Sequence, residues 1–156
     1  MMLSGDLQTF IQYFRQWATA HPDVKFFLFG SVEKGMSFAR SLPEFDYPFI
    51  WLEEPVIVTV DNDAAHVNDR FRVGISALAQ APLDDNDAQI EAYARGPSIM
   101  TDLQLKLRQD RRKAIIHCEL NGQRKEPVSQ LWADGHFGFR LEFEFDMNIN
   151  ATVYQP

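Results

Sequence analysis

Cysteine is almost absent from this 156-residue chain, which contains Cys118 alone. A single cysteine excludes an internal disulfide and any metal site built from several thiolates, and its apolar surroundings predict a buried thiol. The four histidines are scattered, and none is four residues from another or placed at a recognised zinc spacing. They are His21, His66, His117 and His136. We therefore expect neither a metal centre nor a cofactor.

Long hydrophobic runs and basic clusters are also scarce. No apolar run approaches the roughly 18 residues that a membrane span needs, and the N-terminus lacks the basic region and apolar core of a signal peptide. The chain has 15 Lys and Arg against 22 Asp and Glu, a formal net charge of −7. Because an acidic surface repels phosphate backbones, we expect no specific binding of nucleic acid. The scarcity of cysteine, of a signal-peptide pattern and of long apolar runs leads us to expect a cytoplasmic protein that does not bind membranes.

Length and composition indicate one globular domain spanning residues 1–156. A chain of this length buries roughly 70% of the surface of its unfolded state, which is enough for one core. The hydrophobic fraction of 46% and the charged fraction of 24% are usual for globular proteins, and the 13 Phe favour bulky side chains packed on a sheet. The composition therefore excludes a disordered chain.

Two stretches have the periodicity of helices. Apolar residues spaced by three and four predict an amphipathic helix over residues 7–20, with Asp6 as its N-cap. A second helical stretch contains Pro97. Because proline lacks a backbone donor and clashes with the preceding turn, we expect either a kink or two abutting helices, 85–95 and 97–111.

The C-terminal part of the chain has a period of two. Odd positions in the range 137–149 are apolar, and the even positions between them are polar or glycine. This alternation predicts a long β-strand with one face in the core and one in water. The β-branched residues 56–60 predict another strand, with residues 67–79 as its antiparallel partner. The expected fold class is α+β, a mixed and mainly antiparallel sheet with an N-terminal helix and a second, kinked helix on one face.

One segment has the pattern of an enzyme site. Phe-Leu-Phe-Gly-Ser-Val-Glu-Lys-Gly, at residues 27–35, is followed by Glu44 and Asp46 and resembles the opening motif of minimal nucleotidyltransferases. The resemblance covers about 20 residues and implies that Gly30 and Ser31 cradle a phosphate while the two acids hold Mg²⁺.

This resemblance is partial. The acidic pair lies two positions later than in that family, and Glu44 stands where the family has aspartate. The third carboxylate of the family would correspond to Asp61, which follows a predicted strand instead of lying within it. A catalytic site at these residues is therefore an alternative, beside an ordinary turn at Gly30.

The order of segments along the whole chain resembles another group. Residues 47–55, 70–75, 106–111 and 138–145 are similar to segments of proteins encoded in prophage-like and tail-like gene clusters of Bacteroidetes. Those proteins in turn resemble the neck and tail-terminator class of tailed phages, small α+β subunits that assemble into rings at the end of a tail tube. The similarity spans nearly the full chain.

The second resemblance implies a structural protein without catalytic residues, which forms a homo-oligomeric ring in a virion or tail-like particle. Ring assembly uses head-to-tail contacts, which strand edges can supply. The candidate assembly face is the even-numbered face of the C-terminal strand. It includes Arg140, Glu142, Glu144 and Asp146. An intracellular adaptor that binds proteins without any viral connection is a further alternative.

Overall fold

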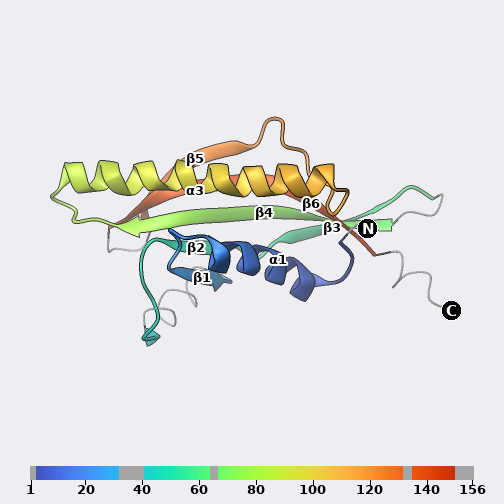
Figure 1. The fold of residues 1–156 in the computed structure, drawn as a ribbon, viewed down its shortest axis with the longest axis horizontal. Coiled ribbons are helices and arrows are strands. Elements are labelled where there is room, and N and C mark those ends of the chain that lie inside the picture. Colours follow the sequence, from blue (N-terminus) through green and yellow to red (C-terminus); the bar gives the residue numbers. More distant parts are fainter. Residues whose placement is uncertain (1–2, 32–40, 64–66, 132–134, 150–156) are drawn as a thin grey trace.

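The computed structural model describes residues 3–31, 41–63, 67–131 and 135–149. The elements in chain order are α1 (Leu7–Ala20), β1 (Phe26–Phe29), β2 (Phe49–Leu52), β3 (Val56–Asp61), β4 (Val67–Gln80), α3 (Asn86–Arg112), β5 (Arg124–Leu131) and β6 (His136–Asn148). Within these residues, six strands form one sheet in the order β1-β2-β4-β6-β5, with β3 also beside β4. Figure 1 shows the two helices against the sheet. The α+β prediction is confirmed.

Two long antiparallel strands, β4 and β6, form the centre of the sheet. Residues 68–80 of β4 pair one by one with residues 148–136 of β6. The predicted alternation is present in β6, where Glu142 and Glu144 are exposed between buried neighbours. Its buried apolar residues include Phe137, Leu141, Phe143, Phe145 and Met147. The strand predicted over 137–149 is confirmed to within one residue at each end.

The sheet is mixed because β1 and β2 run parallel, while the other strand pairs are antiparallel. β2 pairs with the C-terminal half of β4, and β3 pairs with its N-terminal half. Leu52 faces Ile75 and Val56 faces Arg72, so three residues, 53–55, oppose two on β4. This is a β-bulge, and it contains a proline, which cannot donate to a ladder. The bulge separates β2, which also pairs with β1, from β3, which does not.

Both described helices pack on the face of the sheet that carries the odd-numbered side chains of β4 and β6. Phe10 and Phe14 of α1 and Leu103 of α3 belong to one core cluster with Phe71 of β4 and Phe145 of β6. The rings of Phe10 and Phe71 are stacked, with their centroids 4.5 Å apart. The predicted placement of both helices on one face is therefore confirmed, and neither of them covers the opposite face.

α1 begins and ends where the sequence predicts. The Asp6 carboxylate accepts a hydrogen bond from the backbone N–H of Thr9 at 3.1 Å, which satisfies one of the free donors of the first turn. The helix ends at Ala20, and the following residue, His21, has an extended backbone. His21 Nε2 lies 2.8 Å from a carboxylate oxygen of Asp102, so the end of α1 is joined to α3.

α3 is one continuous helix of 27 residues with Pro97 in its interior, so the expectation of two abutting helices is wrong. Figure 1 shows it running unbroken along the sheet. Buried residues on both sides of the proline, among them Ala92 and Ile99, pack on the same sheet face, and this burial offsets the roughly 3 kcal/mol that an internal proline costs. Neither described helix combines the length and apolar composition needed to cross a membrane.

The helix and the sheet approach each other most closely at glycines. A Cβ atom on Gly96 of α3 would collide with the backbone nitrogen of Phe139 on β6. A Cβ atom on the neighbouring Gly138 would collide with the carbonyl oxygen of Ala77 on β4. Glycine at position 96 therefore allows α3 to lie directly on the backbone of β6.

We expect Gly96→Ala to lower the free energy of unfolding by about 1–3 kcal/mol, because the new methyl group meets main-chain atoms that cannot move aside. Helix propensity alone predicts the opposite sign, a stabilisation of about 1 kcal/mol. Urea denaturation measures the difference. Ser98→Ala, at an exposed position of the same helix, is the control, with an expected change below about 0.5 kcal/mol. A stabilised Gly96→Ala variant would contradict the close contact.

Candidate interaction surface

The three carboxylates of the predicted Mg²⁺ site do not come together. Asp46 precedes β2, whose first residue pairs with Leu78 on β4, whereas Asp61 ends β3 and pairs with Val67. Eleven positions of β4 separate these two partners, or about 36 Å at the usual rise of a strand. Because a metal ion needs its oxygen ligands within about 2.6 Å, Asp61 cannot share one with Glu44 and Asp46.

Two acids of this predicted site accept hydrogen bonds from backbone groups close to them in the sequence. Asp46 Oδ1 accepts a hydrogen bond from the backbone N–H of Tyr47 at 2.8 Å, and Asp61 Oδ1 accepts one from that of Asp63 at 2.8 Å. Glu44 is exposed. Across the residues that the structure describes, no three His, Cys, Asp or Glu side chains are grouped so that they could hold a metal ion.

Gly30 is part of the sheet hydrogen bonding instead of an open phosphate turn. Its N–H donates to the carbonyl oxygen of Leu52 at 3.1 Å, and its own carbonyl accepts from Trp51 Nε1 at 2.8 Å. Its φ of 132° is a conformation that favours glycine. Ser31 is exposed, and residues 32–35 of the motif lie outside the described residues. The Gly30 N–H is therefore already used within the sheet, and phosphate binding at Gly30 and Ser31 stays a prediction.

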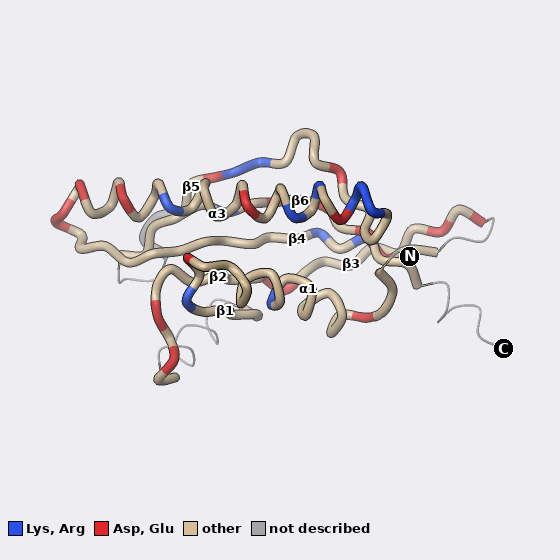
Figure 2. Tube along the Cα trace, in the orientation of Figure 1, with Lys and Arg blue, Asp and Glu red and all other residues tan. Residues whose placement is uncertain are grey.

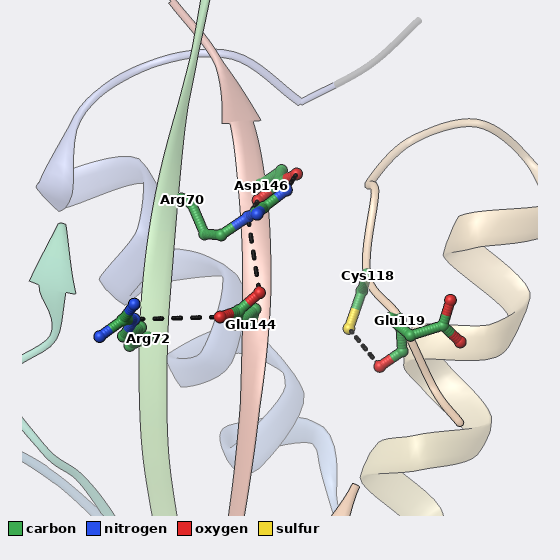
Figure 3. A network of polar contacts seen from close by, with 6 residues as sticks. All are labelled: Arg70, Arg72, Cys118, Glu119, Glu144 and Asp146. Carbon is green, nitrogen blue, oxygen red and sulfur yellow. Dashed lines mark hydrogen bonds and ion pairs between the residues drawn. The ribbon is translucent and has the colours of Figure 1, made fainter. Parts of the chain in front are cut away.

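The even-numbered face of β6 carries a ladder of ion pairs with β4. Arg70 lies directly across from Asp146 and donates two hydrogen bonds to its carboxylate, at 2.8 Å and 3.0 Å. Glu144 lies 3.6 Å from Nε of Arg70 and 3.9 Å from Nε of Arg72. Figure 3 shows these four side chains side by side across the two strands. The hydrogen bonds that Arg70 donates to Asp146 raise the pKa of Arg70, so this guanidinium stays charged.

Arg140 extends the ladder to the bulge between β2 and β3. Its Nε and Nη2 donate to the two carboxylate oxygens of Glu53 at 2.6 Å and 3.3 Å, and its Nη1 donates to Glu142 at 2.9 Å. The pair with Glu53 crosses β4 above Gly74, where a Cβ atom would collide with both side chains. The hydrogen bonds to Glu53 are the main cause that raises the pKa of Arg140, while partial burial opposes it.

The predicted assembly face is therefore one surface, as expected, but its charges are paired within the chain. Arg140, Glu142, Glu144 and Asp146 each have an ionic partner on the same face. A neighbouring subunit that engaged them would have to replace partners already held at hydrogen-bonding distance, and displacing a partly buried ion pair carries a desolvation penalty. The contacts of Arg140 and Asp146 therefore stabilise the sheet, while Glu142 and Glu144 are half exposed or more, and a role of this face in assembly stays a prediction.

β3 presents an open edge. It pairs with β4 on one side, and within the described chain no strand pairs with its other side. Val56, Ile57 and Val58 are 60%, 43% and 39% exposed. An edge of this kind offers unpaired N–H and C=O groups and apolar side chains, which together form a template for another strand.

The edge formed by β5 is different. β5 begins with three charged residues, contains Pro127, and shifts its register near its C-terminal end. Charge, proline and bulges are the devices by which edge strands of natural proteins avoid pairing with other chains. Residues 56–60 of β3 contain no charge and no proline, and they pair with β4 without a shift. Of these two edges, β3 is the more open one, and its exposed apolar residues make it the candidate interaction surface.

The sequence predicts β3 as a strand but does not reveal that it is exposed. A run of β-branched residues has the composition of a buried central strand, because composition does not state which neighbours a strand finds. The available clue is the flanking sequence, in which Pro55 precedes the strand and acids lie on both sides of it. Proline and charge at strand ends are typical of edges.

A hollow of about 410 Å³ lies between the middle of α3 and the segments that precede β1 and β2. Its charged side chains, Asp23, Lys25 and Arg95, are all exposed. Ser98 also lines it, and no hydrogen bond among the described residues joins this hydroxyl to a base, which a nucleophile requires. Among the described residues, the hollow therefore shows no hydrogen-bonded pair of nucleophile and base at Ser98.

Asp110 is a second acid of α3 that joins the two helices. It is 4% exposed, accepts a hydrogen bond from the Tyr13 hydroxyl at 2.6 Å, and lies 2.9 Å from Nζ of Lys106. Burial and the neighbouring carboxylate raise the pKa of Tyr13, so its hydroxyl keeps the proton that it donates. This cluster holds α1 against α3 and is a structural feature.

No family model matches the chain. Comparisons with characterised proteins and with solved structures give no significant match either. The resemblance to phage proteins therefore rests on the sequence segments, and the functional argument rests on the geometry of the sheet and its edges.

We expect a double-mutant cycle between Arg140 and Glu53, using Arg140→Met and Glu53→Gln, to give a coupling energy of about 1–2 kcal/mol, because the pair is bidentate and partly buried. The matched control is the pair of Arg124 and Glu126 on β5. It has a similar N···O distance of 2.9 Å but is more exposed, so we expect a coupling below about 0.5 kcal/mol. Equal couplings, measured by chemical denaturation, would contradict the structural role of Arg140.

Cys118 provides a test by pH. The side chain is buried, and burial raises its pKa to about 12, whereas the unfolded chain has a value near 8.5. The resulting stability is fully present below about pH 8.5 and is lost as pH rises towards 12. Relative to Cys118→Ala, the wild-type protein should therefore lose about 1.4 kcal/mol of unfolding free energy between pH 7.5 and pH 9.5. A constant difference between the two proteins would indicate an accessible thiol.

Proposed function

We propose that this chain is a structural subunit of a phage or prophage-like tail or neck, similar in role to tail-terminator proteins and without catalytic activity. The observation that carries this proposal is the open edge of β3, with Val56, Ile57 and Val58 exposed. A subunit that extends its sheet onto a neighbour uses such an edge, whereas an isolated monomer is exposed to unwanted pairing through it.

The proposed working state is a homo-oligomeric ring. Ring closure needs contacts between two different surfaces of the same chain, and an open strand edge can supply one of them. The net charge of −7 keeps free subunits apart in the cytoplasm before they join the particle, and an acidic ring lumen lets DNA pass without binding it. The nucleotidyltransferase alternative has less support, because the β4 partners of Phe49 and Asp61 are eleven residues apart, about 36 Å along the strand, which places Asp61 far from Glu44 and Asp46.

We expect the purified protein to be monomeric at low salt and high dilution, and to associate as concentration and salt rise. Salt screens the repulsion between acidic subunits and leaves apolar contacts intact. Val58→Lys should shift the mass measured by light scattering towards the monomer, because a lysine on an edge strand opposes strand addition.

Leu105→Lys is the matched control for this experiment. Leu105 is a large apolar residue on α3 with 51% exposure, so the substitution adds the same charge on another surface. We expect it to leave the association unchanged. A wild-type protein that stays monomeric under all conditions would favour the adaptor alternative, and equal effects of the two lysines would exclude β3 as the contact.

A further inference from the structure

We infer that the open edge of β3 preferentially binds an extended apolar segment of another protein that carries basic residues at both ends. This inference rests on the proposed function, because it names the partner of the same edge. The inference predicts that β3 of a second copy of this chain binds the edge more weakly than an apolar segment with basic ends. Three features of the edge lead to it.

The first feature is the charge at the two ends of β3. Glu54 precedes the strand, Asp61 ends it and Asp63 follows it, and all three are exposed. No Lys or Arg occurs in residues 53–63. Figure 2 shows the trace of β3 without basic residues and with acids beyond its end. Both ends of the edge are therefore negative.

The second feature is that, among the described residues, the arginines nearest to β3 are engaged with other acids. Arg70 and Arg72 on β4 lie beside β3, but they are engaged with Glu144 and, for Arg70, with Asp146. Arg140 neutralises Glu53, which lies in the bulge. An incoming segment with lysine or arginine at its ends would meet acids that have no cationic partner on β3 itself.

The third feature makes the edge strands of a second copy of this chain weaker partners for β3. Antiparallel pairing of two β3 strands would bring Glu54 of each copy close to Asp61 and Asp63 of the other, and like charges across strands are destabilising. β5 of a second copy contains Pro127 and a register shift, both of which oppose edge pairing. A segment with basic ends avoids both conflicts.

The exposed apolar residues in the middle of β3 determine which residue types the partner segment carries at its centre. Val56 and Val58 lie on the sheet face of Arg72 and Arg70, while Ile57 lies on the face of Phe71. Apolar side chains are thus exposed on both faces of the edge, so the partner needs β-branched or apolar residues at successive positions. Main-chain hydrogen bonds would supply affinity, and the flanking charges would supply selectivity.

The test uses two fluorescent peptides with the same central run of alternating valine and threonine. One peptide has two lysines at each end, and the other has two glutamates at each end. We expect the lysine peptide to bind the full-length protein at least about tenfold more tightly at low salt, because several charge pairs each contribute a few tenths of a kcal/mol or more. Raising the salt concentration should reduce the difference in affinity between the two peptides. Fluorescence anisotropy measures both affinities.

Two variants distinguish the contribution of the flanking acids from that of the strand edge, and Leu105→Lys is the control. The triple variant Glu54→Gln, Asp61→Asn, Asp63→Asn should retain binding but lose most of the preference for the lysine peptide. Val58→Lys should abolish binding of both peptides, while Leu105→Lys should leave both unchanged. Equal binding of the two peptides by the wild-type protein, or a lysine preference that survives the triple substitution, would overturn the inference.

The outcome also separates this inference from the proposed function. Self-association through β3 should increase with salt, whereas binding of the lysine peptide should decrease with it. A protein that binds the lysine peptide but stays monomeric under all conditions would retain the inference and lose the self-assembling ring. A protein that self-associates through β3 but binds neither peptide would retain the assembly role and overturn the inference.

Discussion

The structure depends on the pairing of β4 with β6 along nearly their full length. Residues 68–80 and 148–136 place apolar side chains on one face and, on part of the other face, the ionic side chains of Arg70, Arg72, Glu144 and Asp146. The apolar face supports both helices through one core cluster, in which Phe71 and Phe145 contact Phe10 of α1. The ionic face needs no covering helix, because its arginines and acids pair across the strands.

The same ionic face also helps to set the position of the open edge. Arg140 on β6 reaches across Gly74 on β4 and binds Glu53 in the bulge, and the backbone N–H of Glu53 donates to the carbonyl of Gly74 at 2.9 Å. These contacts fix the point at which β2 ends and β3 begins. Because the bulge changes the register there, β1 follows β2 alone, and β3 is left with a single neighbour.

Local patterns in the sequence predicted the local structure well. The alternation in 137–149 and the cap at Asp6 were sufficient because each depends on neighbours a few residues away. The sequence left open whether one helix passes through Pro97 or two helices meet there, since the answer depends on a packing energy supplied by distant strands. The separation of Asp46 from Asp61 and the exposure of β3 depend on register and strand order, which composition does not contain.

The open edge is a stronger basis for function than either the charged face or the hollow beside α3. On the charged face, the polar groups already have partners within the chain, so a ligand there exchanges one ion pair for another. Along β3, backbone groups on the outer side have no strand partner in the described chain, so an added strand makes new hydrogen bonds. Backbone pairing alone accepts almost any extended segment. In the proposed binding mode, selection among segments therefore comes from side chains, the apolar ones in the middle of β3 and the acids Glu54, Asp61 and Asp63 at its ends.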